Sequence, residues 1–314
     1  MWDFSIGRTL GLMMQTLPFI AMRMIVYFGI TIAYLAATGA GALVGFGVGH
    51  ISDDPGIFGL WGGVIGFGVV SVVVYWIREY ILYMLKAGHI AVMVELMQGK
   101  TLPDGKGQIE HAKLVVAERF GEANVLFALD QLIKGAIGAI TGLIGGIAAF
   151  IPLPGLNGLV SFINTVIRMS LTYVDEIILG YNIKLNSQNP WETSRQGLVL
   201  YAQNGRIMVK NAIWLSLMLW VIAVVIFIVM LAPMAGLFFL LPGDIAGWSF
   251  VAAIVFAWAF KAAFLEPFAI AALMDVYFRT IEGQVPNVEW DRKLSEASGK
   301  FRELKDKALG GAMA

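Results

Sequence analysis

The chain has 314 residues, of which 58% are hydrophobic and only 14% are charged, and its mean hydropathy is +0.76. Because an average soluble domain carries about 25% charged residues, this composition excludes an ordinary soluble fold. Lys and Arg total 22, as do Asp and Glu, so no net charge argues for nucleic acid as a partner. The absence of cysteine excludes disulfide scaffolds, thiol catalysis and Cys-ligated metal centres. The sequence predicts an all-α polytopic membrane protein.

Residues 1–23 combine an apolar stripe at helical spacing with Asp3 and Arg8, which predicts an interfacial helix rather than a cleavable signal. A membrane-spanning helix needs about 20 mostly apolar residues. Six stretches are candidates for such helices: 24–48, 57–77, 136–151, 156–179, 212–232 and 246–278. The third stretch is short and ends at Pro152, so a re-entrant hairpin formed by the third and fourth stretches is the alternative to two full crossings.

Lys and Arg occur only in alternate connections between these stretches. The connections at 50–56, 152–155 and 233–247 contain none. Because loops rich in Lys and Arg stay on the cytoplasmic side, we expect three transmembrane hairpins with both termini cytoplasmic, in the plasma (inner) membrane. The expected parts are an N-terminal interfacial helix (1–23), a Gly-rich transmembrane hairpin (24–77), a cytoplasmic helical hairpin (78–134), a second transmembrane hairpin (135–182), an interfacial elbow helix (183–205), a third transmembrane hairpin (206–280) and an amphipathic tail (281–314).

Local signals predict where the cytoplasmic helices begin and end. A turn at 103–105 separates the extended second span from a predicted helix over 108–134. Asn189, Pro190 and Glu192 form an N-cap, a first-turn proline and a first-turn acid, which predicts a helix from 190 to about 204. We expect its Trp191, Leu198 and Tyr201 at the level of the lipid headgroups.

The tail repeats apolar residues at steps of three and four, which predicts one amphipathic helix. We expect it to dock on the cytoplasmic helices, and a contact between protomers is the alternative. The repeated positions are Leu294, Ala297, Phe301, Leu304 and Ala308.

Glycines recur at intervals of four in the first and third spans. This spacing places them on one helix face, where another backbone can approach closely. We expect these faces to pack against another helix, of the same chain or of a second copy, and a pore lining is the alternative. The glycines are Gly41, Gly45 and Gly49, and Gly138, Gly142 and Gly146.

A polar stripe follows the fourth span. At about 100° per residue its members fall within an arc of roughly 80°, so the stripe cannot face lipid without a large cost. Arg168 lies near the predicted midplane and Asp175 closer to the cytoplasm. The stripe consists of Asn157, Ser161, Asn164, Arg168, Thr172, Asp175 and Asn182.

The sixth span carries a second pair of charges, Lys261 and Glu266. Five residues correspond to about 140° on an α-helix, so these two are poor partners for each other. We expect pairs between helices instead, Arg168 with Glu266 or Lys261 with Asp175. Pro267 predicts a bend directly after Glu266.

Two interpretations of these charges remain open. In the first, they line a hydrated solute path, because intramembrane charges commonly mark transport pathways. In the second, they form a dry salt-bridge network that fixes how two spans dock. The candidate path residues are Ser161, Asn164, Arg168, Thr172, Asp175, Lys261 and Glu266.

Catalysis finds little support in the sequence. His50, His89 and His111 lack the spacing of metal ligands, and no nucleophile motif occurs. Asp130 and Glu192 are expected to be ordinary solvated charges. We therefore expect no enzyme activity, no metal and no cofactor.

Several short segments of the second half resemble the C-terminal transport core of choline transporter-like proteins. They are Phe120-Gly121 with the helix Gln131 to Lys134, Asn182, Ser194 and Asn204 before a span, and Asp275 to Phe278 leading into Glu282-Gly283. The resemblance implies transport across a membrane. It carries over no binding residue.

Taken together, these patterns predict a membrane transporter or channel for a small solute, with a path between the fourth and sixth spans. The expected partners are the lipid bilayer, the solute and further copies of the chain, with no nucleic acid. The alternative is a non-transporting membrane scaffold or assembly protein, packed through its glycine faces, that binds protein partners on its cytoplasmic side. The two functions differ in whether the polar stripe is wet or dry.

Overall fold

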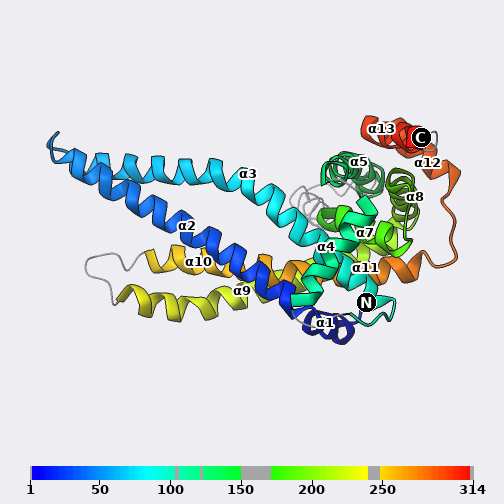
Figure 1. Ribbon diagram of the computed structural model, residues 1–314, viewed down its shortest axis with the longest axis horizontal. Coiled ribbons are helices and arrows are strands. Elements are labelled where there is room, and N and C mark those ends of the chain that lie inside the picture. The colour runs from blue at the N-terminus through cyan, green and yellow to red at the C-terminus, as the bar shows by residue number, and fades with distance from the viewer. Residues whose placement is uncertain (1, 103–105, 121–122, 150–170, 240–247, 312–314) are drawn as a thin grey trace. The chain divides into compact units, whose positions relative to one another are not determined.

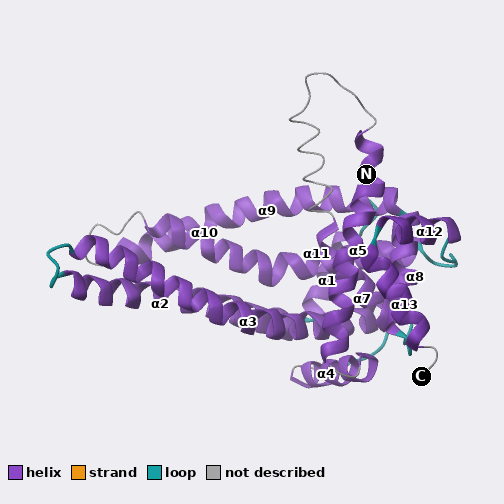
Figure 2. Cartoon of the chain, turned by 90° about the horizontal axis from the view of Figure 1, so that it is seen from above, coloured by secondary structure: helices purple, strands orange, loops and turns teal. Residues whose placement is uncertain are grey.

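The computed structural model describes residues 2–102, 106–120, 123–149, 171–239 and 248–311. Every regular element within these ranges is a helix, as Figure 2 shows. The predicted all-helical fold with long apolar helices is confirmed for this part of the chain. The elements are α1 (Ile6–Gln15), α2 (Leu17–Gly49), α3 (Pro55–Met97), α4 (Lys106–Phe120), α5 (Ala123–Ala149), η1 (Leu171–Tyr173), α7 (Val174–Lys184), α8 (Pro190–Gln203), α9 (Gly205–Phe239), α10 (Trp248–Phe260), η2 (Lys261–Leu265), α11 (Glu266–Thr280), α12 (Val288–Ala297) and α13 (Gly299–Gly311).

The chain divides into two compact units. Unit 1 comprises Met1–Pro18, Ala87–Val221 and Pro267–Ala314, and unit 2 comprises Phe19–Lys86 and Ile222–Glu266. Unit 2 therefore holds α2, most of α3, the second half of α9, α10 and η2. Unit 1 holds the remaining helices.

Four helical segments are long and apolar enough to cross a membrane: Leu17–Gly49, Pro55–Val74, Gly205–Pro233 and Ala253–Thr280. They correspond to the first, second, fifth and sixth predicted spans. The third predicted span begins on α5, and most of the fourth lies in 150–170, outside the described residues. The count of six spans, the three hairpins and the sides of the termini stay predictions.

Within unit 2, α2 and α3 run antiparallel as a long hairpin, drawn in blue and cyan in Figure 1. Their backbones approach so closely that a Cβ at Gly41 would collide with the Gly62 carbonyl, and a Cβ at Gly45 with the Phe58 carbonyl. At Gly49 a Cβ would lie 2.6 Å from Pro55 Cα. These three glycines thus pack against the same chain, because only a residue without a side chain fits at such contacts.

The glycines of α5 differ from those of α2. Among the described residues, nothing lies within 4 Å of a Cβ placed at Gly138 or Gly142. The surroundings of Gly146 lie outside the described residues. The packing role that we predict for the α5 glycines therefore stays a prediction.

Aromatic side chains join α2 to α10 within unit 2. Tyr27 and Trp258 meet edge to face with ring centroids 5.8 Å apart, and Phe28 and Phe256 lie 5.5 Å apart. Tyr27 is buried together with Leu82 of α3 and small residues of α10 and η2. Aromatic pairs of this geometry add to the burial of apolar surface.

The predicted bend before Pro267 takes the form of a π turn. In η2 the Glu266 N–H donates to the Lys261 carbonyl, five residues earlier. Proline has no N–H and its ring would clash with the carbonyl four residues before it, so a wider turn at this point relieves the conflict. The wider turn brings Lys261 and Glu266 closer to one face than the 140° of an α-helix, which corrects our estimate from the sequence.

Unit 1 is a bundle whose core is formed by α5, α7, α8, α11 and α13. α13 packs on α5 and α8, and α7 packs on both α5 and α8. α11 is buried along nearly all of its length, and its Tyr277 hydroxyl donates to the Gly197 carbonyl of α8 at 2.9 Å. Asn182 of α7 donates to the Ser194 hydroxyl of α8 at 2.8 Å. Buried hydrogen bonds thus fix the rotation of these helices about their axes.

The start of α8 agrees with its sequence signals. The Asn189 side chain accepts a hydrogen bond from the Glu192 N–H at 3.2 Å, and Pro190 opens the helix. Leu198 and Tyr201, which we expected at the level of the headgroups, are instead fully buried at 0% exposure. The amphipathic pattern of α8 serves the core of unit 1.

The tail forms two helices rather than the single helix that its periodicity predicts. Ser298 adopts an extended conformation between α12 and α13, and its hydroxyl accepts from the Phe301 N–H at 3.1 Å as the cap of α13. The break rotates α13 relative to α12, so Ala297 is exposed while Leu294, Phe301 and Leu304 are 0% exposed. A Ser-Gly pair favours such a break because Ser caps helices and Gly disfavours their interiors.

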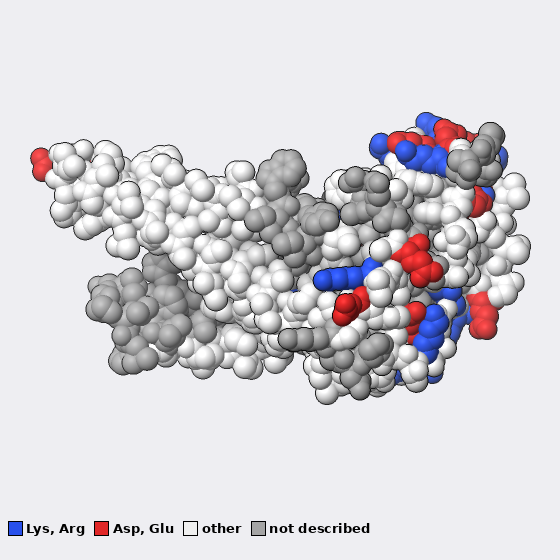
Figure 3. Space-filling model, in the orientation of Figure 1, with Lys and Arg blue, Asp and Glu red and all other residues white. Residues whose placement is uncertain are grey.

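Charged side chains are distributed unevenly over the two units. On the face shown in Figure 3, the surface over α2 and α3 is almost free of charge apart from an acidic patch at the tip of the hairpin. Lys, Arg, Asp and Glu gather over the helices of unit 1, most densely over α12 and α13. The nearly uncharged surface of α2 and α3 agrees with their assignment as candidate membrane spans.

Candidate functional site

The candidate path residues fall into three groups. Ser161, Asn164 and Arg168 lie outside the described residues. Thr172 and Asp175 belong to unit 1, where Thr172 is exposed and Asp175 is buried. Lys261 and Glu266, both half-buried, belong to unit 2. The expected pairs of Arg168 with Glu266 and of Lys261 with Asp175 therefore stay predictions.

The ionic partner of Asp175 within the described residues is Lys134 of α5. Lys134 Nζ lies 3.7 Å from Asp175 Oδ2 and donates to Asp130 Oδ2 at 2.6 Å. The Asp130 and Asp175 carboxyl groups are also in hydrogen-bond contact, and Glu176 follows directly on α7. We call Asp130, Lys134, Asp175 and Glu176 the α5–α7 cluster. It brings three carboxyl groups to one lysine.

The electrostatics of the cluster follow from burial. Burial raises the pKa of Asp130 above its ordinary value of 3.8, although the hydrogen bond from Lys134 opposes the shift. Burial lowers the pKa of Lys134, but the hydrogen bond and charge of Asp130 outweigh it, and the pKa is raised above 10.5. Carboxyl groups that touch cannot both carry a charge at low cost, so the cluster retains a proton more readily than isolated carboxylates do.

Asp130 corrects our sequence analysis, which expected a solvated charge at this position. Its side chain is only 5% exposed. The spacing of Asp130 and Lys134, one helical turn apart, was a signal for an ion pair within a helix. The approach of α7 to α5, which supplies Asp175 and Glu176, had no signal in the sequence.

Another buried carboxylate, outside the α5–α7 cluster, lies at the end of α3. Glu95 accepts from Lys100 Nζ at 2.9 Å and contacts His111 Nε2 of α4 at 2.6 Å. Burial raises the pKa of Glu95, but the hydrogen bonds with Lys100 and His111 outweigh it and hold the pKa below 4.5. His89 is buried and contacts the Thr16 hydroxyl at 2.9 Å. These histidines tie α3 to α4 and to the end of α1.

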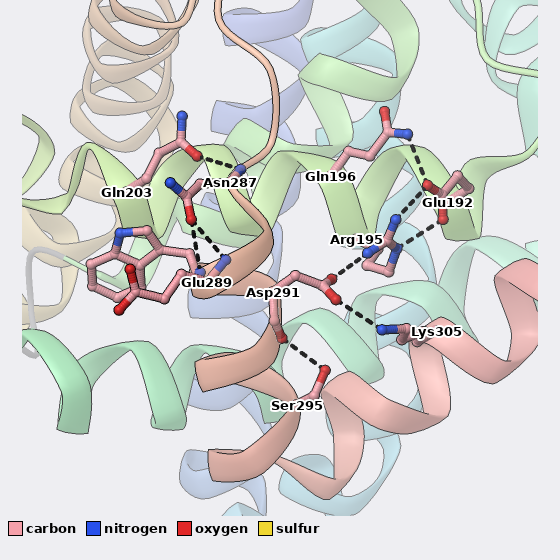
Figure 4. Close-up of polar contacts among 10 residues, drawn as sticks. Glu192, Arg195, Gln196, Gln203, Asn287, Glu289, Asp291, Ser295 and Lys305 are labelled. Carbon is pink, nitrogen blue, oxygen red and sulfur yellow. Dashed lines mark hydrogen bonds and ion pairs between the residues drawn. The ribbon is translucent and has the colours of Figure 1, made fainter.

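The tail is held on α8 by a network of charges, shown in Figure 4. Arg195 donates to both oxygens of Glu192, at 2.8 and 2.7 Å, and to Asp291 of α12. Lys305 of α13 donates to the other Asp291 oxygen at 2.8 Å. The hydrogen bonds from Arg195 lower the pKa of Glu192, and Glu192 raises the pKa of Arg195. We call these four residues the tail clamp.

Uncharged contacts continue the clamp toward the end of α8. Gln203 accepts a hydrogen bond from the Asn287 N–H at 2.9 Å, and Asn287 caps α12 through the Glu289 and Trp290 N–H groups. Asn189 donates to the Ala308 carbonyl of α13 at 3.0 Å. Both helices of the tail are thereby attached along the whole length of α8.

In the described part of unit 1, charged side chains form two kinds of arrangement. Some are paired inside a packed bundle, and others attach the tail to α8 by ion pairs. No group of three or more His, Asp or Glu side chains that could hold a metal occurs among the described residues. Comparisons with protein-family models, curated proteins and solved structures found no match. The resemblance to choline transporter-like proteins therefore stays an expectation.

Proposed function

We propose that this protein is a membrane scaffold, with the apolar helices of unit 2 as its anchor and unit 1 as a helical platform for protein partners. The observation that carries the proposal is the environment of Asp175, a member of the predicted path. Its side chain is only 10% exposed and is paired with Lys134 inside a packed bundle. A buried and paired carboxylate is what a structural role requires, whereas a solute path requires water.

The membrane helices support the same proposal. Only 6% of the Pro55–Val74 window and 11% of the window in Gly205–Pro233 are buried within the chain. These two spans therefore leave most of their surface for contact with lipid or with a second copy.

Transport remains the second candidate because of Lys261 and Glu266. Both lie on the π turn of a candidate span, and neither has an ion-pair partner within 4 Å among the residues that the structure describes. Charges within a span and π turns are both common at functional sites. If the protein is a transporter, the polar stripe of the fourth predicted span is hydrated.

Thiol labelling distinguishes the two functions, and the absence of cysteine removes background reaction. Asn164→Cys lies on the predicted stripe, and Val166→Cys lies off it. Thr172→Cys is exposed in unit 1 and serves as a positive control. For a scaffold, a membrane-impermeant thiol reagent labels Thr172→Cys from one side of the membrane and labels neither of the other two from either side.

Rapid labelling of Asn164→Cys, with Val166→Cys protected, would contradict the scaffold proposal and support a wet path. The next measurement would then be proton flux into liposomes that contain a pH-sensitive dye. Loss of flux in Lys261→Met and Glu266→Gln would assign these two charges to the path.

A further inference from the structure

A cavity of about 400 Å³ lies within unit 1, between α1, the end of α3 and α11. Its lining includes Arg8, Leu12, Gln15, Leu96, Met97 and Asp275. Cavities of roughly 300 to 1,000 Å³ with apolar walls and a few polar groups are typical sites for small ligands. This cavity has that combination.

Helix α1 presents three different faces. Thr9, Leu12 and Met13 are buried against the rest of unit 1, whereas Ile6 and Met14 are 38% and 64% exposed. Arg8 and Gln15 are seven residues apart, which places them within about 20° of each other on a third face. That third face lines the cavity together with Thr9 and Leu12 of the buried face, and the exposed apolar face is typical of a helix that lies in the surface of a bilayer.

The charges beside the cavity leave a positive excess. Arg8 Nη1 lies 3.2 Å from Asp275 Oδ1, and Arg279 Nη2 lies 2.7 Å from Asp275 Oδ2. The nearby Asp3 is paired with Lys210 at 2.7 Å. Arg8 and Asp275 line the cavity itself, and Arg279, which pairs with the same carboxylate, adds a second cation beside it, so the local charge favours an anion.

Arg8 is available to bind such an anion. Among the described residues its guanidinium is held through Nη1 alone, and its side chain is 68% exposed. A guanidinium that is oriented at one nitrogen can offer its remaining N–H groups as a fork to a phosphate or a carboxylate. Asp275, only 13% exposed, orients the guanidinium at the cavity.

We propose that this cavity binds a phosphate group, with Arg8 as the main ligand and Leu12, Leu96 and Met97 as the wall for an apolar portion. The phosphate has two chemical sources, a soluble phosphate monoester and a phospholipid headgroup. A headgroup is within reach because the exposed face of α1 is suited to the bilayer surface, where lipid phosphates lie. The inference is independent of the proposed scaffold function.

Binding is measured on the full chain in a phosphate-free detergent. One arm titrates glycerol phosphate, and the other adds short-chain phosphatidylglycerol, with bound molecules counted by native mass spectrometry. Arg8→Gln removes the fork and is expected to weaken binding about tenfold or more. Arg292→Gln, an exposed arginine of α12 paired with Glu296, is expected to leave binding unchanged.

Two glycines of α1 provide a matched test of the cavity itself. Both have no neighbour within 4 Å of an added Cβ among the described residues, but Gly11 lines the cavity and Gly7 does not. Gly11→Leu therefore places a side chain at the cavity with no clash at its Cβ and is expected to weaken binding, whereas Gly7→Leu is expected to leave binding unchanged.

Binding in either arm that is weakened by Arg8→Gln and Gly11→Leu, but not by Gly7→Leu, supports the proposal. Binding in one arm only identifies the source of the phosphate. Absence of binding in both arms would overturn the proposal. So would losses of binding in Arg292→Gln and Gly7→Leu as large as those in Arg8→Gln and Gly11→Leu.

Discussion

A Cβ at Gly62 of α3 would collide with the carbonyl oxygen of Gly41 on α2, and Gly41 is obstructed by Gly62 in the same way. The two helices therefore meet backbone to backbone at this point. Gly62→Ala is expected to destabilise the hairpin by about 1 to 3 kcal/mol, because the added methyl forces the helices apart. Unfolding of the detergent-solubilised protein by a denaturing detergent measures the loss.

Gly68→Ala is the matched control on the same helix, since a Cβ at Gly68 meets no described atom within 4 Å. It is expected to be neutral or slightly stabilising, because alanine favours a helix more than glycine does. Equal effects of the two substitutions would show that the close contact does not determine the stability of the hairpin.

Lys134→Met removes the cation of the α5–α7 cluster and leaves its carboxyl groups without their ion pair. Lys134 is 46% exposed, so we expect a loss of about 1 to 3 kcal/mol, below the range for a fully buried pair. The loss of stability is expected to be smaller at pH 5 than at pH 8. The pKa of Asp130 is raised, so this carboxyl group takes up a proton more readily at pH 5, and the neutral group depends less on the cation.

Thermal unfolding of the purified protein at the two pH values measures this effect. Lys293→Met on α12, which pairs with the 63% exposed Glu289, is the control and is expected to change stability by less than about 0.5 kcal/mol. A loss of stability for Lys134→Met that does not depend on pH would contradict the uptake of a proton by the carboxyl groups of the α5–α7 cluster.

Glu95 makes the fold sensitive to acid. Its folded-state pKa lies below 4.5, so its contribution to stability is present above pH 4.5 and is lost as the pH falls through the folded pKa. Glu95→Gln is therefore expected to lower stability at pH 7 and to flatten its decline below pH 4.5. Urea titrations at pH 7 and at pH 4 check this, with Glu110→Gln at an exposed position of α4 as the reference.

Arg195→Met removes the residue that joins α8 to α12 in the tail clamp. Glu192 and Asp291 then lose their shared cation, so α12 and α13 are expected to open from α8 at least about tenfold more often. Hydrogen exchange of residues 288–311 measures the opening. Arg292→Met, whose side chain donates a hydrogen bond to Glu296 of the same helix, is expected to leave exchange unchanged. Similar exchange in the two variants would show that the apolar face alone holds the tail.

Sequence signals that act over a few residues predicted local structure well. The Asn189 cap and Pro190 marked the start of α8 correctly, since a cap depends only on its own turn. The tail periodicity identified the buried Phe301 and Leu304 but missed the break at Ser298. The spacing of the apolar residues continues unchanged across the break, so it does not reveal a single non-helical residue. The π turn at Lys261 was missed for a related reason: Pro267 predicts a bend but not its form.

The sequence by itself determined an all-helical chain with long apolar helices, because composition and periodicity report how much of each helix faces an apolar environment. Only the tertiary structure decided that Asp130 is buried, that Asp175 meets Lys134, and that Gly41 lies against Gly62. Those contacts depend on the rotation and offset of helices distant in the chain. Many side chains set that rotation together, and no short segment encodes it.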